Sequence, residues 1–285
     1  MVRMTTEKNI RQAILYIVAT PIGNLDDISV RACHILKSVD IIAAEDTRHS
    51  SRLLSHYGIG TSCLSLHEHN EAGRTSQLLD RMGSGHSVAL ISDAGTPLIS
   101  DPGYRLVVAV RAAGFDVVPV PGACAFVAAL SVAGISTHRF SFEGFLPSTG
   151  SQRRSVLDAL SAEPRTLVFY ESPHRIMSTV KDMRVIFGDE RKVSICRELT
   201  KRFETVYTAS LGQVEDWMSA DPNQQRGEFV IVVSEAEGDQ VGCQQDWVRA
   251  IEELRGYMPL KKACKIVAGL TGASSQQLYR LAEQE

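Results

Sequence analysis

Short apolar runs alternate with amphipathic stretches between residues 14 and 120. This alternation is typical of strand and helix units that build a mostly parallel sheet. We expect five strands here, over residues 14–19, 39–44, 62–66, 88–92 and 117–120. Four helices are expected between them, over residues 28–37, 50–57, 72–82 and 104–113, with Gly114 as the C-cap of the last. The pattern predicts an N-terminal α/β domain over residues 14–122, after an extension of residues 1–13.

The pattern changes after an apolar helix expected over residues 123–133. Five more strands are expected, with fewer helices between them, over residues 140–145, 166–170, 193–197, 205–211 and 228–234. Because the last two runs are arranged like an antiparallel pair, we expect this second sheet to be mixed. These elements predict a second α/β domain over residues 123–236.

A linker and a helical tail are expected at the end of the chain. Residues 235–245 contain two glycines and no periodicity, which indicates a linker. Helices are expected over residues 246–256 and 260–270, and a third begins at Ser274 after a turn at Gly272. Three short helices joined in this way indicate a small module, similar to a helix-turn-helix, over residues 244–285.

Composition narrows the class of protein. A length of 285 residues suits two domains, and 44% hydrophobic with 22% charged residues is typical of a soluble globular protein. The six cysteines are scattered without a Cys-x-x-Cys pair, which indicates free thiols in a reducing cytoplasm. The first apolar run is too short for a signal peptide or a membrane span. The net charge of -3 means that any nucleic-acid partner must be bound by a local basic patch.

Three glycine-containing turns follow strands of the first predicted sheet. They are Thr-Pro-Ile-Gly-Asn-Leu at residues 20–25, Ser-Asp-Ala-Gly-Thr-Pro at 92–97 and Pro-Val-Pro-Gly-Ala at 119–123. Open α/β sheets bind ligands at the carboxyl ends of their strands, where small residues and free helix N–H groups let a ligand approach the backbone. Each turn alone could be ordinary turn chemistry. Together they predict a ligand site at this edge, and the missing Gly-x-Gly-x-x-Gly argues against a nicotinamide dinucleotide.

Charged residues follow the second predicted strand at the same edge. Glu45, Asp46, Arg48 and His49 suit hydrogen bonding to a substrate and removal of a proton. The alternative is a helix start with a surface ion pair. After the third strand, His67-Glu68-His69 shows no third ligand, so we predict no metal site there and favour a substrate-facing loop or a helix cap.

Motifs at strand ends also occur in the second half, at residues 169–175, 197–201 and 226–228, where ion pairing is the simpler interpretation of each one alone. Within these segments, residues 169–171, 197–200 and 227–228, taken in order with the motifs at 20–25, 44–48, 92–103 and 121–122, resemble the tetrapyrrole methylase superfamily. Within it the chain is similar to the branch that methylates the 2'-hydroxyl of a decoding-centre cytidine in 16S ribosomal RNA of the small subunit. The resemblance covers residues 14–285, including the helical tail.

The resemblance implies two α/β domains with S-adenosylmethionine in the cleft between them, and a homodimer. Porphyrin-modifying relatives have Gly-Asp-Pro where this chain has Asp-Ala-Gly-Thr-Pro at residues 93–97, so individual cofactor contacts are not assigned. By position, the cofactor-binding residues would be Pro21, Gly23, Asp93, Ala94, Gly95, Thr96, Leu98, Pro121, Gly122, Ala123, Tyr170, Gly227 and Glu228.

Methyl transfer from a sulfonium to an oxygen is an in-line displacement, so alignment is the enzyme's main task. We expect Glu45, Asp46 and Arg48 to be catalytic, and the proton acceptor is open between Glu45, Asp46 and His49. His49 and Arg175 are expected to contact the RNA. Lys261, Lys262 and Lys265 in the tail are expected to bind phosphate, with a merely solvated basic face as the alternative.

Two other functions are compatible with these patterns. The first is a tetrapyrrole C-methyltransferase, against which stand the helical tail and the departure at residues 93–97. The second is a non-catalytic ribosome-assembly factor that binds RNA through the tail. Binding of S-adenosylmethionine, measured by calorimetry, would favour either enzyme over the assembly factor.

Overall fold

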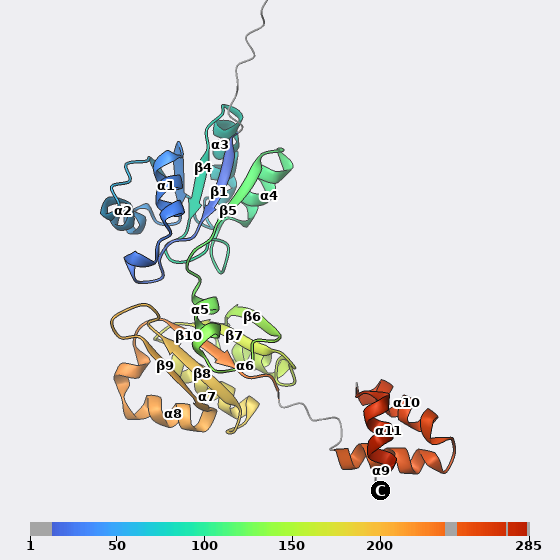
Figure 1. Cartoon of the computed structure of the whole chain (residues 1–285). Helices are drawn as coiled ribbons and strands as arrows, with labels where there is room; N and C mark the ends of the chain where they lie inside the picture. Colours follow the sequence, from blue (N-terminus) through green and yellow to red (C-terminus); the bar gives the residue numbers. More distant parts are fainter. Residues whose placement is uncertain (1–12, 237–243, 272, 284–285) are drawn as a thin grey trace, which may run out of the picture.

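The computed structural model describes residues 13–236, 244–271 and 273–283. The first domain contains a parallel five-stranded sheet with the order β3-β2-β4-β1-β5 (Figure 1). Its strands are β1 (Ile14–Val18), β2 (Ile41–Ala44), β3 (Cys63–Ser65), β4 (Val88–Ile91) and β5 (Asp116–Val120). They alternate with α1 (Val30–Ser38), α2 (Thr47–His56), α3 (Glu71–Gly83) and α4 (Tyr104–Ala112), and a short 3-10 turn, η1 (Leu25–Asp27), precedes α1.

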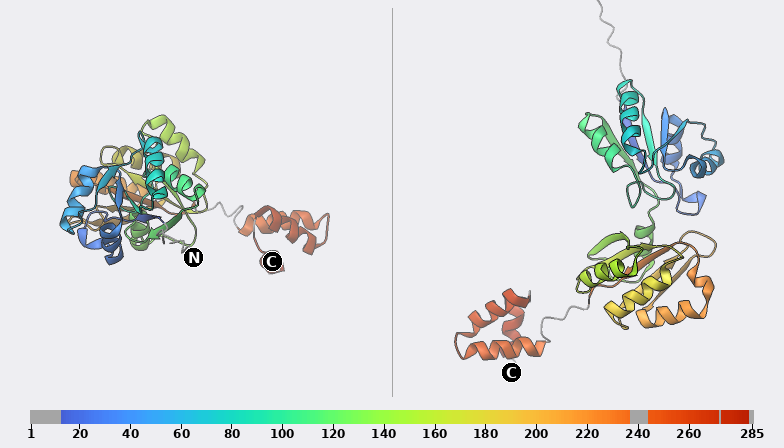
Figure 2. Two further views of the ribbon diagram at one scale, coloured as in Figure 1. Left: turned by 90° about the horizontal axis from the view of Figure 1, so that it is seen from above. Right: turned by 180° about the vertical axis from the view of Figure 1, so that it is seen from behind.

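Helices cover both faces of this sheet (Figure 2), which explains why β2 and β4 are buried along their whole length. One core packs α3 and α4 on one face, around Leu15, Leu78 and Leu106. A second packs α1 and α2 on the other, around Leu36 and Ile42. Each such fully buried side chain stabilises the fold by about 1.5–3 kcal/mol. The connections after neighbouring strands β1 and β4 leave in opposite directions, which makes their carboxyl ends a topological switch point.

The second domain contains a mixed five-stranded sheet with the order β6-β7-β10-β8-β9, in which β6 and β7 are parallel and the other neighbours are antiparallel. The predicted fold class, two α/β domains with one parallel and one mixed sheet, is therefore confirmed. The strands are β6 (Phe140–Phe145), β7 (Thr166–Glu171), β8 (Lys192–Arg197), β9 (Thr205–Ser210) and β10 (Phe229–Val233). The helices are α5 (Ala125–Val132), α6 (Gly150–Ala159), α7 (Ile176–Phe187), α8 (Leu211–Ala220) and the short η2 (Pro222–Gln225).

The expectation of fewer helices between these strands is confirmed, since α6, α7 and α8 stand between them, against four α-helices between the strands of the first sheet. The expected pairing of the last two strands was wrong, because β8 lies between β9 and β10. The physical reason is α8, which begins with a capping box between Ser210 and Gln213 and packs Leu211, Val214 and Met218 into the core. This helix carries the chain across the sheet, and the entirely buried β10 can then occupy a central position.

The C-terminal module consists of α9 (Gln244–Arg255), α10 (Leu260–Thr271) and α11 (Ser275–Glu283). It has a core of its own, formed by Ile251, Ala263, Cys264, Val267, Leu278 and Ala282. Most of the expected linker and of the N-terminal extension lies outside the described residues. In the described part of the chain, no helix is both long and apolar enough to span a membrane.

Candidate functional site

A cavity of about 460 Å³ lies between the two α/β domains. This volume falls in the range of sites for small organic ligands, about 300–1,000 Å³. The first domain contributes the loops after β1, β2 and β4, and the second contributes the start of α5 and residues around β7, β8 and β10. The lining residues are Ile22, Glu45, Asp93, Ala94, Gly95, Thr96, Ile99, Ser100, Asp101, Cys124, Ala125, Phe145, Tyr170, Glu171, Ser172, Pro173, Cys196, Leu199, Glu228, Phe229 and Val230.

The loops after β1, β4 and β5 are tied to one another. Thr20 and Gly95 form an isolated β-bridge. The Thr20 N–H donates to the Gly95 carbonyl at 2.8 Å, and the Gly95 N–H donates to the Thr20 carbonyl at 3.1 Å. Gly95 has φ of +86°, a left-handed conformation that glycine adopts without the strain other residues experience. The Thr96 hydroxyl donates to the Ala123 carbonyl at 3.0 Å, which fixes the start of the α5 segment against the same loop. These bonds hold a cavity wall of small residues in place.

The ends of β2 and β4 are connected through their acidic residues. The Asp93 carboxylate accepts from the Asp46 N–H at 3.1 Å, and Glu45 accepts from the Asp93 N–H at 3.5 Å. Burial, with the neighbouring charge of Asp93, raises the pKa of Glu45 above its usual range. The side chains of Glu45 and Asp93 thus both line the cavity and join the two strand ends.

Asp101 is a cavity residue that was not predicted from the sequence. Burial, together with the charges of Glu45 and Asp93, raises its pKa to about 6, against the opposing effect of a hydrogen bond from Ser92. The signal in the sequence was present, because Asp101 lies in a Ser-Asp-Pro-Gly turn within the motif at residues 92–103. That turn resembles many others, and only its position against the second domain distinguishes it.

Asp46, Arg48 and His49 form the start of α2 and are not among the lining residues. Asp46 is the N-cap, which accepts from the Arg48 N–H at 2.8 Å and pairs with the Arg48 guanidinium at 3.3 Å. That hydrogen bonding lowers the pKa of the Asp46 carboxyl below its usual range. Arg48 and His49 are exposed. The helix-start arrangement therefore exists, and it leaves Arg48 and His49 accessible from solvent.

Aromatic and charged residues of β7 form the opposite wall. The Tyr170 hydroxyl accepts from the Phe126 N–H at 3.3 Å, and burial raises the pKa of this phenol. Glu171 is buried and pairs with Arg175 at 2.8 Å. Arg175 also donates to the Leu146 carbonyl at 3.1 Å, so its guanidinium is engaged within the domain.

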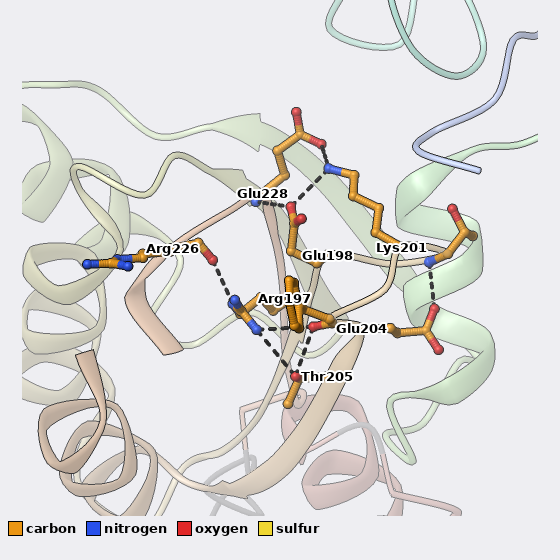
Figure 3. A network of polar contacts seen from close by, with 9 residues as sticks. Arg197, Glu198, Lys201, Glu204, Thr205, Arg226 and Glu228 are labelled. Atoms are coloured by element: carbon orange, nitrogen blue, oxygen red, sulfur yellow. Dashed lines mark hydrogen bonds and ion pairs between the residues drawn. The ribbon is translucent and has the colours of Figure 1, made fainter. Parts of the chain in front are cut away.

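A network of charged side chains lies at the seam between the domains (Figure 3). The Lys201 ammonium donates to Glu198 at 2.9 Å and to Glu228 at 2.7 Å. The Glu228 N–H also donates to Glu198 at 2.9 Å. Gly23 from the first domain approaches so closely that a Cβ added there would lie 2.4 Å from Lys201 Cγ. Lys201 therefore connects the loop after β1 with two loops of the second domain.

The predicted cofactor-binding residues divide into two groups. Those that line the cavity are Asp93, Ala94, Gly95, Thr96, Tyr170 and Glu228. Those that lie in the same or adjoining loops without lining it are Pro21, Gly23, Leu98, Pro121, Gly122, Ala123 and Gly227. Several lining residues were not predicted from the sequence, of which Asp101, Cys124 and Phe145 are the clearest.

The remaining predicted residues lie elsewhere. Lys261, Lys262 and Lys265 are exposed on α10 of the C-terminal module. His67 and His69 face each other edge to face, with ring centroids 6.0 Å apart. Among the residues that the structure describes, no group of three or more histidine, cysteine or acidic side chains is placed to bind a metal ion.

Comparison with known proteins assigns a family to this arrangement. The family model described as Tetrapyrrole (Corrin/Porphyrin) Methylases matches residues 14–215, and the one described as RsmI C-terminal HTH domain matches residues 243–285. The chain is 51% identical to Ribosomal RNA small subunit methyltransferase I of Pseudomonas aeruginosa, over 95% of this chain and 96% of that one. It is 46% identical to the protein of the same name from Escherichia coli O157:H7, over 96% of both chains.

Solved structures show the same fold at low sequence identity. A cobalt precorrin-4 methyltransferase matches with a TM-score of 0.58 and 20% identity, covering 78% of this chain and 94% of that one. A diphthine synthase matches with a TM-score of 0.59 and 14% identity, covering 78% and 90%. At this level of identity the likeness concerns the fold alone.

Proposed function

This chain belongs to the ribosomal RNA small subunit methyltransferase I branch of the tetrapyrrole methylases, and on that premise we propose its reaction. It transfers a methyl group from S-adenosylmethionine to the 2'-hydroxyl of a cytidine in 16S ribosomal RNA, at the decoding centre of the small subunit. The relatives' names support ribosomal RNA as the substrate. The observation that carries the proposal in this chain is the charge of the cavity between the domains.

Among its described lining residues the cavity has acidic side chains and no lysine, arginine or histidine. A wall of this kind disfavours the phosphates of a dinucleotide and favours a ligand with positive charge. S-adenosylmethionine fits, because it carries a sulfonium and an amino group, and when bound it supplies an activated methyl group. The acidic lining residues are Glu45, Asp93, Asp101, Glu171 and Glu228. Glu171 and Glu228 are paired with Arg175 and Lys201, so the charge available to a ligand comes chiefly from the three acids of the first domain.

The residues that would hold this cofactor come from both domains. Ala94 is exposed, and both Ala94 and Gly95 line the cavity with little or no side chain, which allows close approach. The carboxylates of Asp93 and Glu228 can accept hydrogen bonds from amino and hydroxyl groups. The Tyr170 ring, in edge contact with Phe145 at 5.6 Å between centroids, supplies an apolar wall. The remaining predicted cofactor residues would act by shaping the loops that carry these groups.

The chain's contribution to the reaction is to align the hydroxyl and to accept its proton. Glu45, which lines the cavity, is our candidate for such a role. Arg48 and His49 are exposed at the start of α2, where they can contact phosphate or base. Asp46 would contribute by orienting Arg48 through its hydrogen bond and ion pair with that residue. Arg175 would stabilise the wall through its pair with Glu171.

We assign RNA binding to the C-terminal module as well. The chain has a net charge of -3, so a local basic surface has to attract the phosphates, and Lys261, Lys262 and Lys265 are exposed on one helix. Changing all three to glutamine should weaken binding to small subunits and lower the log-log salt slope by about 0.7–0.9 for each lost phosphate contact. The affinity for S-adenosylmethionine should not change. A salt titration identical to that of the parent would exclude this module as the RNA contact.

We further propose that the protein is a cytoplasmic homodimer. A shallow hollow is lined by Val127, Leu130, Ile135 and Phe140 together with Ser131, Gly134 and Thr137, and the large apolar side chains of Val127 and Phe140 are exposed there. Apolar patches of this kind mark association surfaces. Light scattering coupled to gel filtration measures the mass, and a monomer at micromolar concentration would contradict the assignment.

Transfer of a tritiated methyl group tests the proposed reaction. The substrates are undermethylated small subunits, free 16S RNA and a tetrapyrrole precursor, and the product nucleoside is identified by mass spectrometry. Methylation of RNA with formation of 2'-O-methylcytidine supports the proposal. Methylation of the tetrapyrrole alone would favour the C-methyltransferase alternative. Absence of both transfer and cofactor binding would favour an assembly factor.

A further inference from the structure

Phe145 is an exposed aromatic residue at the opening of the cavity between the domains. It is the last residue of β6, an edge strand of the second sheet, and it lines the cavity although it is 54% exposed. Exposure alone would not distinguish it, since single apolar residues are common on protein surfaces. What distinguishes Phe145 is an irregularity of the backbone that turns its ring toward the cavity.

This irregularity is a β-bulge in β6. Phe142 pairs with Val168 and Phe145 pairs with Tyr170, and the register of β6 against β7 shifts between Phe142 and Gly144. Val168 and Tyr170 lie on the face of the sheet that packs against α5. In a regular strand, residues three apart point to opposite faces. The bulge supplies one extra residue, so that Phe142 and Phe145 share the face of Tyr170.

Both domains fix the position of the bulge. Gly144 has φ of +66°, and a Cβ added there would lie 3.4 Å from the hydroxyl oxygen of Ser100 in the loop after β4. The far end of that loop is fixed by Glu71, which is buried at the start of α3. Glu71 accepts from the Gly103 N–H at 3.2 Å and from the Arg105 N–H at 3.0 Å, and so caps the start of α4. The bulge therefore lies against a loop that is itself held in place.

The segment that follows β7 is tied to the residue next to Phe145. Arg175 donates to the Leu146 carbonyl at 3.1 Å and to the Ser172 hydroxyl at 3.3 Å. Ser172 and Pro173 also line the cavity, and Pro173 is exposed. The second domain thus places an aromatic ring, a proline ring and a hydroxyl group on its side of the cavity.

We propose that the ring of Phe145 stacks on the base of the target cytidine, which the RNA presents unpaired. The proposal rests on the methyl transfer proposed above, and it adds the group that holds the base while the ribose hydroxyl meets the methyl group. Sequence-specific recognition of RNA commonly uses unstacked bases that lie on aromatic side chains and form hydrogen bonds along their edges. Phe145 supplies such a ring, and the Ser172 hydroxyl can donate to an edge of the base or accept from it.

Exposure favours a base of the RNA over the adenine of the cofactor as the group on this ring. Small ligands in cavities have about 70–90% of their surface buried, and such a ligand covers the deeper residues, of which Gly95 is buried and Tyr170 half-buried. Phe145 lies further out, in edge contact with Tyr170 at 5.6 Å between ring centroids. An RNA chain cannot enter a cavity of about 460 Å³, so only its target nucleotide reaches in, and it meets the groups at the opening first.

Alanine, leucine and tyrosine substitutions of Phe145 test the proposal. Loss of one base–aromatic stack corresponds to about 5–150-fold in affinity. Phe145→Ala should therefore lower kcat/KM for undermethylated small subunits by about 5–150-fold, with S-adenosylmethionine affinity in calorimetry within about threefold of the parent. Phe145→Leu keeps apolar volume without a ring and should lose nearly as much. Phe145→Tyr keeps the ring and should stay within about threefold of the parent in both assays.

Phe203→Ala is the matched control. Phe203 is 62% exposed in the loop after β8 and is not among the residues that line the cavity. This variant should behave like the parent in methyl transfer and in cofactor binding. Thermal unfolding and light scattering should show that every variant is folded and has the mass of the parent.

A photocrosslink locates the contact directly. A benzoyl derivative of phenylalanine is incorporated at position 145, and the complex with undermethylated small subunits is irradiated. Primer extension on 16S RNA should map the crosslink to the target cytidine or to an adjacent nucleotide. The same derivative at position 203 should not give this crosslink. A crosslink from position 145 that maps elsewhere would overturn the proposal.

The outcomes separate this proposal from the proposed reaction. If the parent methylates small subunits and Phe145→Ala stays within about threefold of it, no base stacks on Phe145 and the reaction stands. The proposal is also overturned if Phe145→Ala loses cofactor affinity as much as kcat/KM, because the ring then contacts the cofactor. A lower mass of Phe145→Ala would place the ring in a dimer interface instead. Full activity of Phe145→Leu would show that apolar volume suffices without stacking. If the parent transfers no methyl group to RNA, the proposed reaction fails, and this proposal fails with it.

Discussion

Lys201 should stabilise the junction of the two domains, and Lys201→Met tests this while keeping most of the side chain's volume. The ammonium lies 2.9 Å from Glu198 and 2.7 Å from Glu228 (Figure 3). Its aliphatic stem packs against Gly23 of the first domain. The substitution removes the charge and both hydrogen bonds, and it leaves the stem in place.

Exposure decides how much each contact contributes. The Glu228 side chain is 74% exposed, so that pair belongs with surface ion pairs worth about 0–1 kcal/mol. Glu198 is 18% exposed and Lys201 is 25% exposed, so their charge-assisted bond contributes more. Glu198 keeps the Glu228 N–H as a donor after the substitution, which limits the loss. We expect Lys201→Met to lower the free energy of unfolding by about 1–2 kcal/mol, or about 2–8 °C in Tm.

The pH dependence has a defined sign. Burial alone would raise the pKa of Glu198, but its bonds to Lys201 and the Glu228 N–H outweigh this effect and lower the pKa. The contribution of ionised Glu198 to stability is therefore present above about pH 4.3, and it is lost as the pH falls through the lowered pKa. Burial of Lys201 is likewise outweighed by its bonds to Glu228 and Glu198, which raise its pKa. That contribution is complete below about pH 10.4 and lost on alkalinisation. The difference between Lys201→Met and the parent should be constant between about pH 5 and 10.

Thermal and urea unfolding, followed by fluorescence, measure this difference. Lys181→Met, at an exposed lysine of α7, is the matched control and should change Tm by less than about 1 °C. Gly23→Ala is an independent perturbation of the same contact, because its new Cβ would displace the Lys201 stem. If Lys201→Met were as stable as Lys181→Met across this pH range, the network would contribute nothing to the junction, and the reasoning would be refuted.

Three further predictions concern the cavity. Gly95→Leu should abolish S-adenosylmethionine binding in calorimetry while unfolding stays cooperative, because Gly95 lines the cavity and a Cβ there would already lie 3.3 Å from Ile22; unchanged affinity would disprove the placement. Glu71→Ala should lower stability by about 1–2 kcal/mol and slow turnover, whereas Glu71→Gln, which can still accept both N–H groups, should lose much less in denaturation and turnover assays; equal losses would argue against the capping role. Glu45→Gln and Asp46→Asn should reduce turnover more than cofactor affinity, and equal reductions would identify them as cofactor ligands.

The fold could be predicted largely because its first sheet is buried on both faces. Strands such as β2 and β4 are then continuous apolar runs, and amphipathic helices separate them clearly. The pairing of β9 and β10 could not be predicted in the same way. Strands that follow one another in the sequence usually pair, which is why β9 and β10 were expected to be neighbours. They are not, because the chain passes through α8, which packs on the core, before it returns as β10 on the other side of β8.

The candidate site could be predicted only in part, for a related reason. Parallel strands bring their carboxyl ends to one edge, so residues such as Asp93 and Gly95 could be grouped without a structure. The wall formed by the second domain depends on how the two sheets face each other. The pattern of apolar and polar residues predicts the strands and helices of each domain, but it does not predict that arrangement. The contact between Gly23 and Lys201 and the position of Asp101 are of this kind. Charged residues at strand ends indicated a site without indicating which of them point into it.

The residues with strained backbone lie in the loops that shape the cavity. The described non-glycine residues with positive φ are Leu98 and Ser100 in the loop after β4, and Glu198 and Thr200 in the loop after β8. Each loop belongs to one wall of the same cavity, and each is held by a charged side chain. Glu71 reaches the first loop from α3, whereas Lys201 belongs to the second loop itself. Glu71 caps the first loop, and Lys201 binds Glu198 in the second. Strain of about 1–3 kcal/mol per residue would relax without such fastening. The geometry of the cavity therefore depends on residues that do not line it, since neither Glu71 nor Lys201 is among the lining residues.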